Sequence, residues 1–121
     1  MDDDRVWAFE ESLWTADEAH YRESIDEGYL LVVPQPPYVF GGEEAVRALA
    51  NTPRWSEVRF SEQRVSRPQE GLIVVAYSVE AARGQERYVA HCTSTYRRLE
   101  HEVWKVVQHQ QTPPLVVGDG A

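Results

Sequence analysis

A single glutamate near the start of the chain lies among large apolar residues. Glu10 is one helical turn from Trp7 and Trp14, in a segment whose apolar residues recur every three or four positions. Burial among tryptophans would raise the pKa of this carboxyl group and make it useful as an acid or base near neutral pH. In the alternative interpretation, Glu10 completes a buried hydrogen-bond network, since structural networks also perturb pKa values.

Polar side chains on later strands could face the same space as Glu10. If Glu10 moved protons, Tyr77 or Tyr88 could donate a hydrogen bond to a developing oxyanion, so the candidate catalytic residues are Glu10 and Tyr77. We expect a pocket for a small apolar or aromatic molecule between the first helix and a concave sheet. The same aromatic residues could equally form a filled core. The expected lining comprises Trp7, Glu10, Trp14, Tyr77, Tyr88, Cys92, Ser94, Tyr96, Trp104 and Gln108.

Two histidines in the last strands raise the question of a metal site. We expect His91 and His109 to be cross-strand neighbours on the outer face of the sheet. Two imidazoles without a nearby Asp or Cys do not complete a tetrahedral ligand set, so we predict no metal and no cofactor. Together with Thr93, Thr95 and Val107, these histidines instead suit the interface of a homodimer.

Other reactive residue types lack the neighbours that their chemistry needs. Cys92 has no adjacent cation and is expected to be an inert buried thiol. Ser94 has neither a histidine on its own face nor a glycine elbow, which argues against a hydrolase triad. The Gly41-Gly42 pair precedes a helix but lacks the lysine of a phosphate-binding loop.

The faces of the sheet are assigned from the last two strands, residues 88–96 and 104–110. Side chains alternate along a strand, so the even-numbered residues of this hairpin should share the covered face. A two-residue loop at Arg83-Gly84 would put Tyr77 on that face too. A loop at 99–101 brings four pairs of residues opposite each other: Tyr96 with Trp104, Ser94 with Val106, Cys92 with Gln108, and His91 with His109.

Helices are expected before strands along the chain. The patterns predict helices at 4–15, from Thr15 to Gly28, and at 43–51, a short strand at 29–33, and strands at 55–66, with a bulge, and 72–79. This order is typical of an α+β fold with three helices packed on a curved antiparallel four-strand sheet plus a short extra strand. We expect one domain over residues 1–112, followed by a flexible or partner-packed tail at 113–121.

Composition limits the classes of function. The 121 residues carry a formal net charge of −8, which would repel phosphate backbones, so we expect no nucleic-acid partner. No apolar run reaches membrane-spanning length and the chain opens with acidic residues, so we expect no membrane association and no signal peptide. The single cysteine excludes a disulfide framework, and a cytoplasmic location is the expectation.

The chain resembles the nuclear transport factor 2-like (SnoaL-like) superfamily, and most closely its small bacterial members in domain of unknown function 4440. The resemblance rests on Leu13-Trp14, Tyr21, the strand ending at Pro34, Arg54-Trp55, Tyr77, the Tyr88–Ser94 pattern and the closing segment 104–113. It implies an α+β cone, a fold that hosts isomerases, dehydratases, epoxide hydrolases, cyclases and non-enzymatic binding or dimerising modules.

One departure from that superfamily bears on function. The ketosteroid isomerase branch carries an aspartate base after its first strand, where this chain reads Val32-Val33-Pro34-Gln35, and the inward side of strand 88–96 has no acidic residue. We therefore expect a small-molecule-binding or dimerisation domain. The alternative is a cofactor-independent acid–base enzyme (isomerase, dehydratase or cyclase) that uses Glu10.

Overall fold

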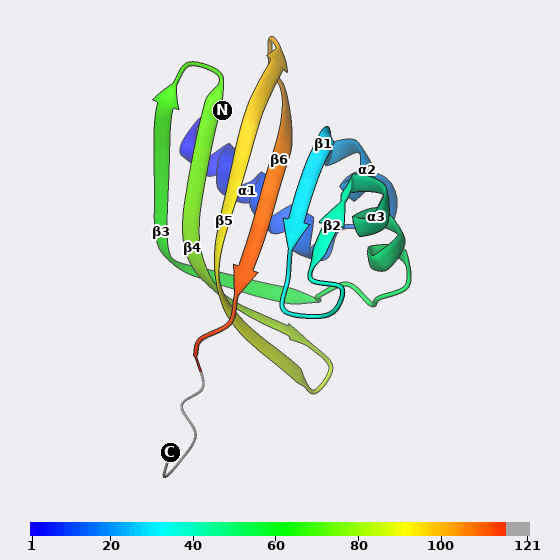
Figure 1. Cartoon of the computed structure of the whole chain (residues 1–121). Coiled ribbons are helices and arrows are strands. Elements are labelled where there is room, and N and C mark those ends of the chain that lie inside the picture. The colour runs from blue at the N-terminus through cyan, green and yellow to red at the C-terminus, as the bar shows by residue number, and fades with distance from the viewer. Residues whose placement is uncertain (116–121) are drawn as a thin grey trace.

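In the part of the chain that the structure describes, one curved sheet of six strands forms the framework, and the three helices lie on the same face of it (Figure 1). The computed structural model describes residues 1–115. The helices are α1 (Asp3–Thr15), α2 (Glu18–Ser24) and α3 (Gly42–Ala50). The strands are β1 (Ile25–Val32), β2 (Val39–Gly41), β3 (Glu57–Gln69), β4 (Leu72–Arg83), β5 (Glu86–Glu100) and β6 (Val103–Thr112). Their order in the sheet is β2-β1-β6-β5-β4-β3.

The first two helices are capped by aspartates. Asp2 accepts a hydrogen bond from the Arg5 backbone N–H at 2.9 Å, and Asp17 accepts one from the His20 N–H at 3.0 Å. The expected start of the second helix at Thr15 is wrong, because the Thr15 hydroxyl donates to Glu11 O within α1. This helix also ends at Ser24 rather than at Gly28.

The helix α2 stops early because the next residues join the sheet. Ile25 is extended and pairs with Val106, and Leu30 to Val32 continue in parallel pairing with β6. The sheet therefore gains a long parallel strand where a short strand was expected, and β2 adds an unpredicted edge strand beyond it. By pairing with β6, these residues satisfy the backbone N–H and C=O groups that hydrogen bonds within a longer α2 would otherwise have satisfied.

The long strands β3, β4 and β5 bend sharply, so their lower parts sweep beneath α1, α2 and α3 in the view of Figure 1. The pairing of β3 with β4 shifts between Ser61 and Arg64, and Glu62 has a φ of 52°. This confirms the predicted bulge in β3, and a bulge bends its strand. The bend closes one end of the cone, which matters for the position of the cavity described below.

The pairing of β5 with β6 differs from the prediction. Tyr96 lies opposite Val106, but Thr95 lies opposite Gln108, so Val107 is an extra residue without a partner. Because side chains alternate, this bulge turns Gln108 outward and His109 inward. His109 pairs with Ser94 rather than with His91, and only 5% of its surface is exposed. The predicted His91–His109 pair and the outward placement of His109 are both wrong.

The inner face of the sheet otherwise carries the residues expected there. Tyr77, Ser94, Tyr96 and Trp104 are all buried beneath the helices. The β4–β5 loop lies at Gly84-Gln85 rather than Arg83-Gly84, a two-residue shift of pairing that leaves every side chain on its predicted face. The α+β class is confirmed. Within residues 1–115 no helix is both long and apolar enough to cross a bilayer. Residues 116–121 of the expected tail lie outside the described part of the chain.

Candidate ligand-binding site

Glu10 is completely buried, and four side chains converge on its carboxylate. Tyr96 donates its hydroxyl hydrogen to Oε1, while the Tyr77 hydroxyl and, at 2.7 Å, the Ser94 hydroxyl donate to Oε2. The fourth neighbour is His109, whose Nδ1 lies 3.4 Å from Oε2. A buried carboxylate needs such donors to offset its lost hydration.

The hydrogens of this network determine the tautomer of His109. The single hydroxyl hydrogen of Ser94 goes to Glu10, so the 2.7 Å contact between Ser94 Oγ and His109 Nδ1 requires a hydrogen on Nδ1. In the neutral ring, Nε2 then has a free lone pair and accepts from Gln111 Nε2 at 3.2 Å. Gln111 Oε1 in turn accepts from the Tyr88 hydroxyl at 3.0 Å.

The pKa of Glu10 is lowered, contrary to the prediction. Burial raises it, as expected, but the hydrogen bond and charge of His109, with the hydroxyl donors Tyr77 and Tyr96, outweigh burial. Glu10 is therefore held as a carboxylate and is not a proton donor near neutral pH. The geometry around Glu10 therefore matches the alternative interpretation, in which this residue completes a buried hydrogen-bond network.

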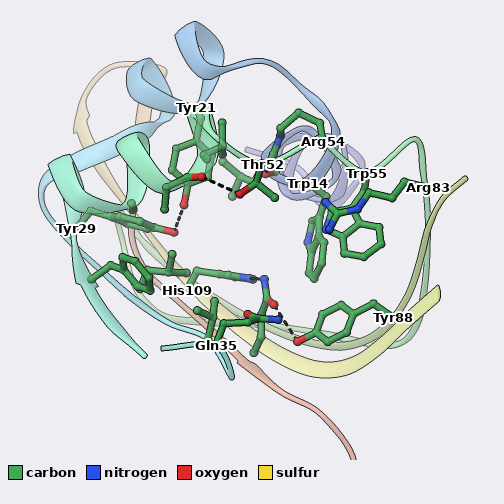
Figure 2. Close-up of a pocket in the computed structure, with 18 of the residues that line it drawn as sticks. Trp14, Tyr21, Tyr29, Gln35, Thr52, Arg54, Trp55, Arg83, Tyr88 and His109 are labelled. Atoms are coloured by element: carbon green, nitrogen blue, oxygen red, sulfur yellow. Dashed lines mark hydrogen bonds between the residues drawn. The ribbon is translucent and has the colours of Figure 1, made fainter. Parts of the chain in front are cut away.

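A cavity of about 380 Å³ opens beside this network, and His109 lines it whereas Glu10 does not (Figure 2). It lies where α2, α3 and β1 meet the segment before β3, the β4–β5 hairpin and the end of β6. Figure 2 shows Trp14, Arg54 and Trp55 along one side of the space, with His109 and Gln35 across from them. His109 is therefore the group through which the buried carboxylate reaches the cavity.

The cavity lies further along the cone than the predicted pocket. Of the ten predicted lining residues, only Trp14 and Tyr88 line it. Gln108 faces outward and donates to Thr95 Oγ1 at 2.9 Å, as a result of the Val107 bulge. The other seven pack on the inner face without lining this cavity: Trp7, Glu10, Tyr77, Cys92, Ser94, Tyr96 and Trp104.

Cys92 and His91 lie on the faces that were expected for them. Burial, together with the charge of Glu10, raises the pKa of Cys92 to about 12, which keeps its thiol protonated. His91 is exposed and its Nδ1 lies 2.8 Å from Ser78 Oγ. Within residues 1–115 no three His, Cys, Asp or Glu side chains converge as a metal-ligand set.

Several lining residues were missed by the sequence analysis. Arg54 and Trp55 precede β3, and Arg83 ends β4, so tertiary contact alone brings these missed residues beside the predicted Tyr88. Arg83 lies 4.0 Å from the centroid of the Trp55 ring, which stacks on Tyr88 at 15°. The inward position of His109, by contrast, could have been predicted from the sequence. The consecutive apolar residues Val106 and Val107 break alternation in the way that indicated the β3 bulge.

Comparisons with known proteins concern the fold. Neither protein-family models nor curated proteins match the sequence. A candidate ketosteroid isomerase from Parabacteroides distasonis is similar in structure, with a TM-score of 0.76 and 18% identity over 90% of this chain and 85% of that chain. A nuclear transport factor 2-like protein of unknown function in nutrient uptake, from Rhodospirillum rubrum, has the same score and identity over 91% and 98%. The association domain of C. elegans CaMKII has a TM-score of 0.69 and 14% identity, over 88% of each chain.

These similarities define the class of structure. The chain has the α+β cone fold of nuclear transport factor 2-like proteins, with a buried carboxylate–histidine pair at the edge of a cavity. Because this fold carries many activities, the function has to be argued from the cavity itself.

Proposed function

We propose that the protein binds a small organic molecule in the cavity lined by Trp14, Trp55, Tyr88 and His109. The observation that carries this proposal is a space of about 380 Å³ in the range typical of ligand pockets. Its walls combine apolar side chains with a few polar groups from separate elements, among them Gln35, His109 and Gln111. A filled cone, as in a purely structural domain, would lack such a space.

Filling the cavity tests this proposal. Ala48 lines the cavity from α3, whereas Ala50 lies on the same helix outside the lining, and both are exposed. A set of small aromatic acids, amides and amines is titrated into labelled protein, and the indole N–H signals of Trp14 and Trp55 are followed by NMR. We expect shifts that are lost in Ala48→Trp and kept in Ala50→Trp. No shift with any compound, or equal binding by Ala48→Trp, would reject the proposal.

A second candidate function is acid–base catalysis without a cofactor. The specific observation is the Glu10–Ser94–His109 network, in which the Nε2 lone pair of the neutral His109 ring accepts only from Gln111, a cavity-lining side chain that a bound molecule would have to displace. In this version His109 removes a proton from the bound molecule, and Glu10 stabilises the resulting imidazolium. Glu10 itself does not reach the cavity, and Tyr77 is occupied by Glu10 and Trp14.

Isotope exchange separates catalysis from binding. Enolisable ketones and acids that bind are incubated in D₂O, and loss of the C–H signal is followed by NMR. Catalysis predicts exchange that His109→Gln abolishes while binding persists. Exchange at the same rate in His109→Gln would remove the histidine from the chemistry, and no exchange at all would leave binding as the sole function.

We also propose that the protein forms a homodimer through the outer face of the sheet. The helices leave this face uncovered (Figure 1), and it carries His91, Thr93 and Thr95. Structures similar in fold include proteins named association domains. Thr93→Arg should convert a dimer to a monomer in sedimentation velocity, whereas Glu11→Arg, on the helix side, should not. A wild-type monomer would rule out this interface.

We further propose that the chain is a bacterial, cytoplasmic protein of the SnoaL-like group called domain of unknown function 4440. Support comes from the residue pattern around Leu13-Trp14, Arg54-Trp55 and Trp104, and from the single cysteine, Cys92, which is buried and has no second cysteine to pair with in the chain. Fractionation of the cells that produce the protein tests the location. Recovery outside the cytoplasm would contradict it.

A further inference from the structure

Arg54 lines the cavity with hydrogen-bond donors that are only partly used by the protein. Its Nε donates to Ala16 O at 2.8 Å, and Nη2 donates to Leu13 O, so two donors cap the carboxyl end of α1. These bonds hold the guanidinium at the cavity wall, 5.9 Å from the centroid of the Tyr21 ring. Within residues 1–115 the other edge, Nη1 and the second N–H of Nη2, has no hydrogen-bond partner.

The charge of Arg54 is also unmatched. Within residues 1–115 it makes no ion pair, and the other three arginines without one, Arg47, Arg64 and Arg87, are exposed, whereas Arg54 is half-buried. Burial, and to a smaller extent the charge of Arg83, lower the pKa of Arg54. A half-buried guanidinium is stabilised by an anion, and none of the described side chains supplies it.

The neighbouring arginine is not available for the same purpose. Arg83 donates from Nε and Nη2 to the two carboxylate oxygens of Glu86, at 2.9 Å and 3.1 Å, and from Nη1 to Pro53 O. It also stacks on Trp55. Arg83 is therefore a neutralised part of the wall, and one free guanidinium edge remains for a ligand.

Within residues 1–115, no acidic side chain lines the cavity. Its lining includes Arg54, Arg83 and His109 but neither Asp nor Glu, in a chain whose net charge is −8. Glu10 lies behind His109 and is occupied by its own donors. The cavity is thus a local cationic site that favours an anion, against the charge of the whole molecule.

The free edge of the Arg54 guanidinium and the shape of the cavity walls indicate which anion and which ligand body would fit. Two parallel N–H groups on one free edge match the two oxygens of a carboxylate, while a phosphate would leave further oxygens without a second free cation. Apart from a few polar groups such as Gln35 and Gln111, the remaining walls are aromatic or aliphatic, with Trp14, Trp55 and Tyr88 among them and Phe40 and Leu49 from β2 and α3. We propose that the ligand is a small organic monocarboxylate with a flat apolar body, and that Arg54 binds its carboxylate.

This inference rests on the proposed binding function, and a matched series of probes tests it. Phenylacetate, phenylacetamide and 2-phenylethylamine share a ring and differ in charge, and their affinities are measured by calorimetry. We expect phenylacetate to bind at least about tenfold more tightly than the amide, and the amine to bind most weakly. In Arg54→Gln the acid and the amide should bind alike, Arg54→Lys should be intermediate, and Arg47→Gln, an exposed control on α3, should behave as wild type.

The outcomes distinguish the two proposals. If the amide or amine binds as tightly as the acid and Ala48→Trp still blocks binding, the cavity binds ligands but the carboxylate inference is overturned. If no probe binds, or Ala48→Trp has no effect, the binding function and the inference both fail. Should Arg54→Gln not fold, because Arg54 caps α1, the wild-type ratio of acid to amide and its change in Arg54→Lys decide the question.

Discussion

The Nδ1 atom of His109 lies 3.4 Å from Oε2 of Glu10, although these residues are contributed by opposite ends of the chain. Glu10 comes from α1 and is fully buried, whereas His109 comes from β6 and borders the cavity. This pairing couples the interior of the cone to its binding space, and it leads to four predictions beyond the tests above.

Replacing the buried carboxylate should destabilise the fold. In Glu10→Gln the carboxamide cannot accept hydrogen bonds at both ends, so at least one of the hydroxyl donors loses its acceptor. We expect the free energy of unfolding to fall by roughly 2–4 kcal/mol in chemical denaturation. Glu11→Gln, exposed on the same helix, should change it by less than about 0.5 kcal/mol. Equal effects of the two variants would contradict the network.

Stability should depend on pH through Glu10. Its pKa in the folded state is below the ordinary value of 4.5, so in that region the unfolded chain binds more protons than the folded one. The stabilisation is complete above the unfolded value and is lost as the pH falls through the folded value. Unfolding curves measured from about pH 7 to about pH 3 should show the wild type losing more stability than Glu10→Gln. Parallel losses would show that Glu10 does not carry the effect.

The two tyrosines that donate to Glu10 should differ in importance. The Tyr77 hydroxyl also accepts the Trp14 indole N–H at 3.0 Å. Tyr77→Phe therefore removes a donor to Glu10 and also leaves the buried indole N–H without an acceptor, whereas Tyr96→Phe removes one donor to Glu10 only. We expect losses of roughly 3 kcal/mol or more for Tyr77→Phe and roughly 2 kcal/mol for Tyr96→Phe. Denaturation of both variants under one condition measures the difference, and the reverse order would contradict the assignment.

His109 should be found as the Nδ1–H tautomer when its ring is neutral. The reason is that Ser94 has one hydroxyl hydrogen and gives it to Glu10. Long-range ¹H–¹⁵N NMR distinguishes the two nitrogens directly. Tyr88→Phe frees Gln111 and should shift the Nε2 signal with little effect on Nδ1. A dominant Nε2–H form would mean that the Ser94 hydroxyl points toward His109 instead.

The sequence by itself determined the α+β class and the inward faces of most elements. The apolar spacing around Glu10 placed it beneath the sheet, and strict alternation placed Tyr77, Ser94 and Tyr96 opposite it. These features are local: they follow from the periods of 3.6 and 2 residues and survive a pairing shift of two, as at the β4–β5 hairpin.

Only the tertiary structure decided where the cavity lies and what faces it. One unpaired residue, Val107, inverts the end of β6 and exchanges Gln108 for His109, because a strand shifted by one position turns every later side chain over. Pairing of β1 with β6 shortens α2, and the bend of β3 brings Arg54 and Trp55 to α1. Such contacts join residues far apart in the chain, and their energies depend on the assembled sheet rather than on any local pattern.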